Sequence, residues 1–75
     1  MKRKTKKFDI YLVRGDYEVC RHDTMHFNDI ELAKNKYDEW IAEGGYDCIS
    51  IYGCEWRTGV LCAVKLLFEY IPTWG

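Results

Sequence analysis

The sequence predicts an α+β fold in the order ββαββ, with a four-stranded antiparallel sheet and one helix packed on one of its faces. Three observations predict this class. Apolar residues alternate with period two in segments near both ends of the chain, which is typical of strands. Between them lies one amphipathic segment, with capping residues at its start and two glycines at its end. The chain has 75 residues, enough for a single small domain.

The first predicted strand covers residues 8–14, where apolar side chains recur at every second position. Gly15-Asp16 follows as a two-residue turn, because glycine readily adopts the positive φ that tight hairpin turns need. Residues 17–21 return as the second strand, and a polar loop covers residues 22–25. The pairs expected from this turn are Leu12 with Val19 and Tyr11 with Cys20.

The helix is the clearest local prediction. Asn28 is the expected N-cap, with Glu31 placed to bond back to it. Phe27 has the spacing to pack on Leu32 as a hydrophobic staple. The helix should end near residue 43, before two glycines. The stripe expected to face the sheet is Ile30, Ala33, Tyr37, Trp40 and Ile41.

The second half of the chain predicts another hairpin. Residues 46–57 form a strand with a bulge at Gly53, Thr58-Gly59 forms the turn, and the last strand ends before Pro72. A helix over residues 61–70 is the competing interpretation, and the regular alternation favours the strand. The expected pairs are Trp56–Leu61, Cys54–Ala63, Tyr52–Lys65, Ile51–Leu66, Ser50–Leu67 and Ile49–Phe68.

Residues 59–71 are the most informative stretch, because they are apolar on both faces of the predicted strand. A sheet with one solvated face should alternate apolar and polar residues cleanly. A domain of this size covers one face with its helix, so the outer face calls for a partner, unless loops or the end of the chain cover it. The residues expected to bind a partner there are Tyr11, Tyr46, Tyr52, Trp56, Leu61 and Leu67.

Charge divides the chain into two parts. Residues 1–7 hold five of the eleven basic residues and are expected to form a flexible basic tail. Residues 8–75 form the single ββαββ domain, whose six basic and twelve acidic residues give a formal charge of −6. No signal peptide or membrane-spanning segment is apparent, so we expect a cytoplasmic protein with reduced cysteines.

No catalytic or cofactor motif is recognisable, so we expect neither an enzyme nor a cofactor. Cys20, His22 and His26, with Cys54 as a fourth ligand, are the candidate residues for a zinc site, but their spacing matches no common zinc module. We therefore expect no metal. Cys54 and Cys62 should point to opposite faces of the last hairpin and stay free.

These observations favour a small protein-binding module or a homodimer. A nucleic-acid-binding module that combines the basic tail with sheet aromatics is the alternative. Its weakness is the acidic body, which repels phosphate.

The helix pattern Phe27-Asn28-Asp29…Ala33…Tyr37…Trp40, in a compact acidic ββαββ chain, resembles small accessory proteins of phages and mobile elements. Anti-defence inhibitors, including anti-CRISPR proteins, belong to that class. The resemblance lies in these general features over most of the chain, and it assigns no functional residue. It implies stoichiometric binding to a host protein complex. An uncharacterised bacterial protein of the same shape is the alternative.

Overall fold

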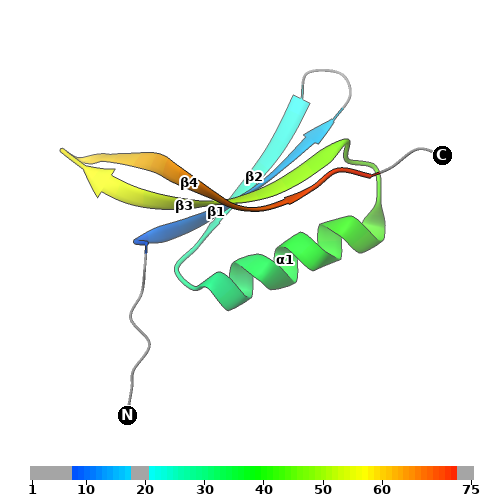
Figure 1. Ribbon diagram of the computed structural model, residues 1–75, viewed down its shortest axis with the longest axis horizontal. Coiled ribbons are helices and arrows are strands. Elements are labelled where there is room, and N and C mark those ends of the chain that lie inside the picture. The colour runs from blue at the N-terminus through cyan, green and yellow to red at the C-terminus, as the bar shows by residue number, and fades with distance from the viewer. Residues whose placement is uncertain (1–7, 18–20, 73–75) are drawn as a thin grey trace, which may run out of the picture.

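A computed structural model describes residues 8–17 and 21–72. They form one antiparallel sheet of four strands, in the order β2-β1-β3-β4, with a helix against one face (Figure 1). The predicted fold class is therefore confirmed. The expected basic tail of residues 1–7 lies outside the described residues, as does Trp74. The elements are β1 (Ile10–Tyr17), β2 (Arg21–Phe27), α1 (Ile30–Glu43), β3 (Cys48–Arg57) and β4 (Val60–Tyr70).

The first hairpin turns later than predicted. Gly15 and Asp16 lie inside β1, and residues 22–25, expected to form a loop, belong to β2. Gly15 has a packing role, since a Cβ atom there would lie 2.5 Å from the Tyr46 ring. A glycine that permits close approach was therefore mistaken for a turn glycine. The register places Leu12 opposite His26 and Tyr11 opposite Phe27 instead of Val19 and Cys20, which lie outside the described residues.

The helix begins one residue later than predicted. Asp29 is the N-cap, and its side chain accepts a hydrogen bond of 3.0 Å from the Glu31 backbone N–H. The expected staple is wrong: Leu32 is 52% exposed, whereas Phe27 packs against the core. The helix ends as expected, with Gly44 at a φ of 78°. The predicted apolar stripe does face the sheet.

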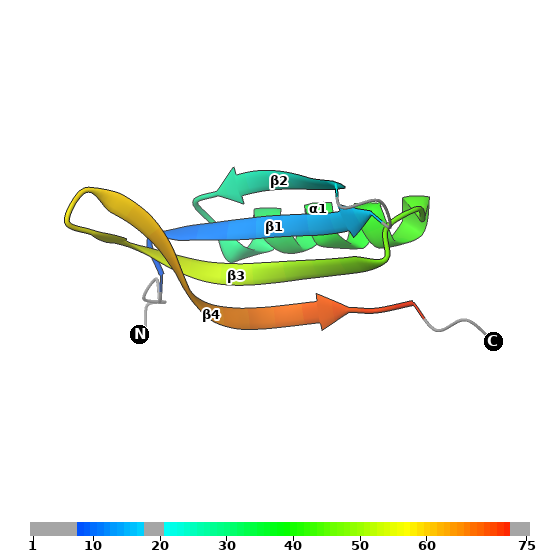
Figure 2. The same ribbon diagram turned by 90° about the horizontal axis from the view of Figure 1, so that it is seen from above.

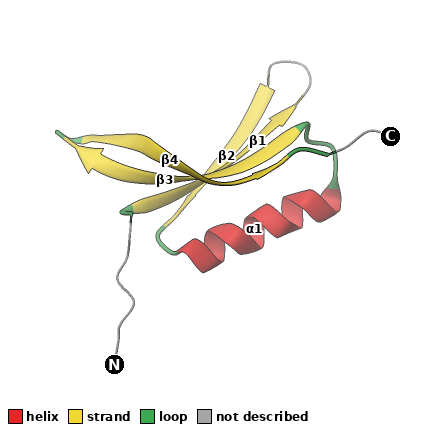
Figure 3. Ribbon diagram, in the orientation of Figure 1, coloured by secondary structure: helices red, strands yellow, loops and turns green. Residues whose placement is uncertain are grey.

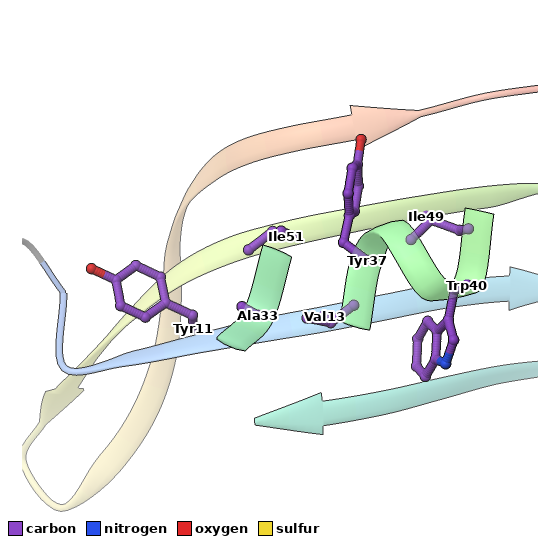
Figure 4. Packing of buried hydrophobic residues seen from close by; sticks show 7 residues of the cluster. All are labelled: Tyr11, Val13, Ala33, Tyr37, Trp40, Ile49 and Ile51. Carbon is purple, nitrogen blue, oxygen red and sulfur yellow. The ribbon is translucent and has the colours of Figure 1, made fainter. Parts of the chain in front are cut away.

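The core lies between the helix and the two central strands (Figure 4). Val13 from β1 and Ile51 from β3 are fully buried beneath Ala33 and Tyr37 of the helix. Burying an aliphatic side chain of this kind contributes roughly 1.5–3 kcal/mol. Figure 3 shows α1 along one side of the sheet. The helix packs chiefly on β1 and β3 and also contacts β2, so the edge strand β4 receives much less cover (Figure 2).

The second hairpin follows the prediction near its turn and departs from it farther away. Thr58 and Gly59 both have positive φ, and Trp56 pairs with Leu61 as expected. Two register shifts then intervene, one of them next to Gly53 where a bulge was predicted, and both insert the extra residue into β4. The observed pairs beyond the shifts are Tyr52–Leu66, Ile51–Phe68, Ser50–Glu69 and Ile49–Tyr70, so the four pairs predicted there are wrong.

Candidate binding site on the outer sheet face

Among residues 8–17 and 21–72, no helix packs on the face of the sheet opposite α1. The second hairpin is strongly twisted, and near its turn β4 crosses β3 and β1 in the view of Figure 2. Because strand residues alternate between faces, the strand registers define which side chains share this outer face. They form rows that run across the sheet. From the open end of the β3–β4 hairpin towards its turn, the rows are: His22, Asp16 and Cys48; Thr24, Arg14, Ser50 and Glu69; His26, Leu12, Tyr52 and Leu66; Ile10, Cys54 and Ala63; Trp56 and Leu61.

The outer face is thus divided into two halves. The half nearest the β3–β4 turn carries mainly apolar side chains, among which Cys54 is buried. We call them the apolar patch: Ile10, Leu12, Tyr52, Cys54, Trp56, Leu61, Ala63 and Leu66. Trp56 is 57% exposed and Leu66 44% exposed. The hairpin that carries them extends past the N-terminal end of α1 (Figure 1). Two large apolar side chains therefore remain open to solvent on a single face.

The other half is polar. Arg14 Nε donates to Asp16 Oδ1 at 3.0 Å, and both side chains are partly exposed. On the neighbouring strands, Cys48 Sγ lies 3.7 Å from Ser50 Oγ and 3.8 Å from Glu69 Oε2. Burial raises the pKa of the Cys48 thiol, which favours its protonated form over the nucleophilic thiolate. This half carries charges of both signs.

The structure places only three of the six predicted site residues on the outer face, namely Tyr52, Trp56 and Leu61. Tyr11 is 5% exposed and belongs to the core under the helix. The placement was wrong because β1 is a central strand with apolar residues on both faces, so its pattern does not reveal which face meets the helix.

The expected placements of Tyr46 and Leu67 are also wrong. Tyr46 precedes β3, and its ring packs over Gly15 on the helix side. Leu67 is the extra residue between the pairs Ile51–Phe68 and Tyr52–Leu66, and it packs against the core. The sequence interpretation missed Leu66, Ile10 and Leu12. The bulge that moves Leu66 to the outer face leaves no local signal beyond Gly53.

Tyr46 instead belongs to a stack of rings that we call the aromatic clamp. Its ring stacks on Tyr17 at 4.7 Å and on Trp40 at 5.0 Å between centroids. The hydroxyls of Tyr17 and Tyr46 donate to Asp23 Oδ2 at 2.7 and 2.9 Å. These hydrogen bonds lower the pKa of Asp23, while burial raises that of Tyr46. Because the rings stack on one another, the clamp joins the first hairpin to the helix and leaves no gap for a ligand between them.

The helix side of the sheet carries a second, less open apolar region beside β4. Phe68 lies 5.9 Å from Tyr37 between ring centroids, and Lys34 Nζ lies 5.3 Å from the Phe68 ring centre. An open hollow of about 280 Å³ lies nearby. It is lined by Trp40, Ile41, Gly44, Gly45, Tyr46, Asp47, Ile49, Tyr70 and Pro72. Its titratable side chains are Asp47 and the phenols of Tyr46 and Tyr70.

The cysteine and histidine residues weighed as zinc ligands are not brought together among the described residues. Cys20 lies outside them. His22 and His26 are both on β2, where four residues of strand separate two Cα atoms by about 13 Å. Cys54 pairs with Ile10, two strands away from β2. Cys48, Cys54 and Cys62 are free thiols.

No protein-family model matches the chain, and no curated protein or solved structure shows significant similarity to it. Within the described residues, no helix has the length and hydropathy needed to cross a membrane.

Proposed function

We propose that this chain is a small non-enzymatic binding protein that docks on another protein through the outer face of its sheet. The observation that carries the proposal is the pair Trp56 and Leu66, exposed in one apolar patch on a face that no helix covers within residues 8–17 and 21–72. Large exposed apolar patches on small proteins usually mark interaction sites, and tryptophan and tyrosine are favoured anchors at interfaces.

The patch has the anatomy of a docking surface. Tyr52 and Leu12 are half-buried at its centre, so their conformations are already restrained before a partner binds. Trp56 at the hairpin end offers the largest side chain for burial. Charged groups such as Arg14 and Glu69 lie to one side, where they can select the partner's orientation.

The narrower form of this proposal is stoichiometric inhibition or modulation of a host protein complex. It is supported by the resemblance in style to phage and mobile-element accessory proteins, and by a surface suited to binding without catalysis. Such a protein would act at a one-to-one ratio with its target, without turnover.

Nucleic-acid binding is the second candidate. Tyr52 and Trp56 lie on the open face, where aromatic rings can stack on bases. The −6 charge of residues 8–75 opposes phosphate binding. A gel-shift assay at low salt, with and without residues 1–7, tests this candidate. We expect no shift, and binding by the full chain would favour the second candidate over the first.

Affinity capture with matched variants tests the protein-binding proposal. The tagged chain is co-expressed in cells with an untagged copy of itself, and the proteins that it retains from the cell lysate are identified. They are compared with the proteins that the Trp56→Ala and Leu61→Asp variants retain. Leu32→Asp is the control, because Leu32 is similarly exposed but lies on the helix. We expect retained protein to be lost in both patch variants and kept in the control. Equal retention by all four chains would contradict the proposal.

A further inference from the structure

The edge strand β4 is irregular in its middle. Val64 and Leu67 are the extra residues at the two register shifts between β3 and β4. Each extra residue exchanges the faces of the residues that follow it, so the second shift reverses the first. Lys65 and Leu66, which lie between the shifts, are therefore inverted relative to the strand on either side of them. The strand is strongly twisted in this region, as bulged strands are (Figure 2).

The inversion places each of these two side chains on the less suitable face. Lys65 pairs with Gly53 and lies on the helix side of the sheet. Leu66 pairs with Tyr52 and is 44% exposed on the outer face. A charged residue on the side that carries the helix and an apolar residue on the open side reverse the ordinary pattern. Such a conflict between local pattern and fold marks a strained or functional position.

A strand without extra residues would remove this conflict. If β4 continued from its turn in the register of the pair Cys54–Ala63, every residue of β3 would have its own partner on β4. We call this arrangement the straight register and the arrangement in the structure the bulged register. Residues 68–70 differ between the two by two positions along β3, or about 7 Å. Because this number is even, their side chains keep the same faces.

The two registers differ mainly in which residues lie beside the core. In the straight register, Leu66 would lie opposite the buried Ile51 and Lys65 would lie opposite Tyr52 on the outer face. Each of these side chains would then be on the face that suits it. The straight register therefore satisfies the apolar pattern of β4, whereas the bulged register does not.

Contacts near the end of β4 favour the bulged register. Leu67 packs against the core. The Phe68 ring centre lies 5.9 Å from that of Tyr37 and 5.3 Å from Lys34 Nζ. Ring pairs and cation–π contacts of this kind are individually weak. A small number of weak contacts thus opposes the better pattern of the straight register.

Little of the fold blocks a change of register. As an edge strand, β4 pairs with β3 alone, and the helix packs chiefly on β1 and β3. The turn at Thr58-Gly59 and the pairs from there to Cys54–Ala63 are common to both registers. Only the strand after Ala63 has to move, and it has no neighbouring strand on its other side.

We propose that β4 exchanges between the two registers, with the bulged register as the major state and the straight register as a minor one. The exchange switches the residue beside Tyr52 from Leu66 to Lys65. The apolar patch is therefore continuous in the bulged register and interrupted by a charge in the straight register. This inference goes beyond the proposed function, and only the effect of the switch on a bound protein rests on that function.

Two lysine substitutions at neighbouring positions should bias the registers in opposite directions. Leu67→Lys places a charge against the core in the bulged register and on the outer face in the straight one. Leu66→Lys places a charge on the outer face in the bulged register and opposite Ile51 in the straight one. Because burying an unpaired charge is costly, each change should alter the ratio of the registers roughly tenfold or more. Leu32→Lys, at an exposed helix position, is the control and should leave the ratio unchanged.

Nuclear magnetic resonance distinguishes the registers through contacts across the hairpin. We expect Ile51 beside Phe68 in the wild-type chain and beside residue 66 in Leu67→Lys. Saturation-transfer measurements detect minor states populated at about 1%, within the usual range for such equilibria. We expect one in the wild-type chain, confined to β4 after Ala63 and its partners on β3, with the chemical shifts of Leu67→Lys. It should disappear in Leu66→Lys and persist in the Leu32→Lys control.

Circular dichroism shows whether the variants are folded. If one of the two β4 variants is unfolded, the wild-type minor state and the other variant decide. The proposal would be overturned by the absence of a minor state in the wild-type chain, by its persistence in Leu66→Lys, or by a folded Leu67→Lys chain that keeps Ile51 beside Phe68. A wild-type chain that shows the minor state but binds no protein would contradict the proposed function alone and leave the register exchange standing.

Discussion

The two faces of the sheet are built from the same strands but differ in completeness. On the helix side, Gly15 and Gly53 lie directly under the rings of Tyr46 and Phe8, where a Cβ atom would come within 2.6 Å of ring carbons. Backbone and rings are thus in close contact there. On the outer face, Trp56 is 57% exposed. The difference teaches that the helix face is close-packed over the central strands β1 and β3, whereas no helix packs on the outer face within the described residues.

The largest expected effect is a difference in stability between truncating a side chain on the helix face and truncating one on the outer face. Ile51→Ala should lower the free energy of unfolding by about 3 kcal/mol, because it leaves a cavity at a fully buried site. Leu66→Ala on the outer face should cost less than about 1 kcal/mol in the monomer, since Leu66 is already 44% exposed. Urea unfolding at a concentration where the chain is monomeric measures both. Equal losses would show that the faces do not differ as described.

The close packing of the helix face can be tested at Gly15. Gly15→Ala places its Cβ 2.5 Å from Cε1 of Tyr46, so the ring must move and the aromatic clamp is disturbed. We expect a loss of about 2 kcal/mol. In a Tyr46→Ala background the same change should cost almost nothing, because the obstructing ring is gone. Thermal unfolding of the four chains gives the coupling, and additive losses would contradict the packing role of Gly15.

The start of the helix offers a smaller test. Asp29→Ala should cost about 1 kcal/mol, because the Glu31 N–H loses its side-chain acceptor. Asn28→Ala should be nearly neutral, since Asp29 and not Asn28 provides the cap. Chemical denaturation of both variants compares them directly. A larger loss of stability in Asn28→Ala than in Asp29→Ala would show that Asn28 is the N-cap, as the sequence predicts.

The smallest effect concerns the pH dependence of the aromatic clamp. Hydrogen bonds from Tyr17 and Tyr46 lower the pKa of Asp23 in the folded chain. A lowered folded-state pKa means that the stabilisation is present above the unfolded pKa of about 4 and is lost as pH falls through the folded value. Asp23→Asn should therefore lose less stability than wild type between neutral and strongly acidic pH. If the free energy of unfolding falls equally with pH in the two chains, Asp23 does not contribute to the stability of the aromatic clamp.

Much of the fold follows from local signals in the sequence. The glycine at position 44 ends the helix, and Thr58-Gly59 sets the pairing of Trp56 with Leu61. These features depend on backbone conformation near one residue, which sequence patterns describe well. The apolar stripe of the helix was likewise predicted because its period is set by the helix itself.

The site was predicted less completely because it depends on contacts between distant segments. In the sequence Gly15 resembles a turn residue, because the Tyr46 ring that packs over it comes from 31 positions later in the chain. The bulges in β4 exchange the faces of Leu66 and Leu67, although the sequence pattern alternates regularly. Tyr11 belongs to a central strand that is apolar on both sides. In each case tertiary packing decides between two local arrangements of similar quality.

Affinity capture from a cell lysate tests protein binding through the outer face most directly. The tagged wild-type chain is compared with its Trp56→Ala and Leu32→Asp variants, which change exposed positions on the outer face and on the helix. The account predicts that the wild-type chain and Leu32→Asp retain the same protein in similar amounts and that Trp56→Ala loses it. Equal retention by all three chains would contradict the account.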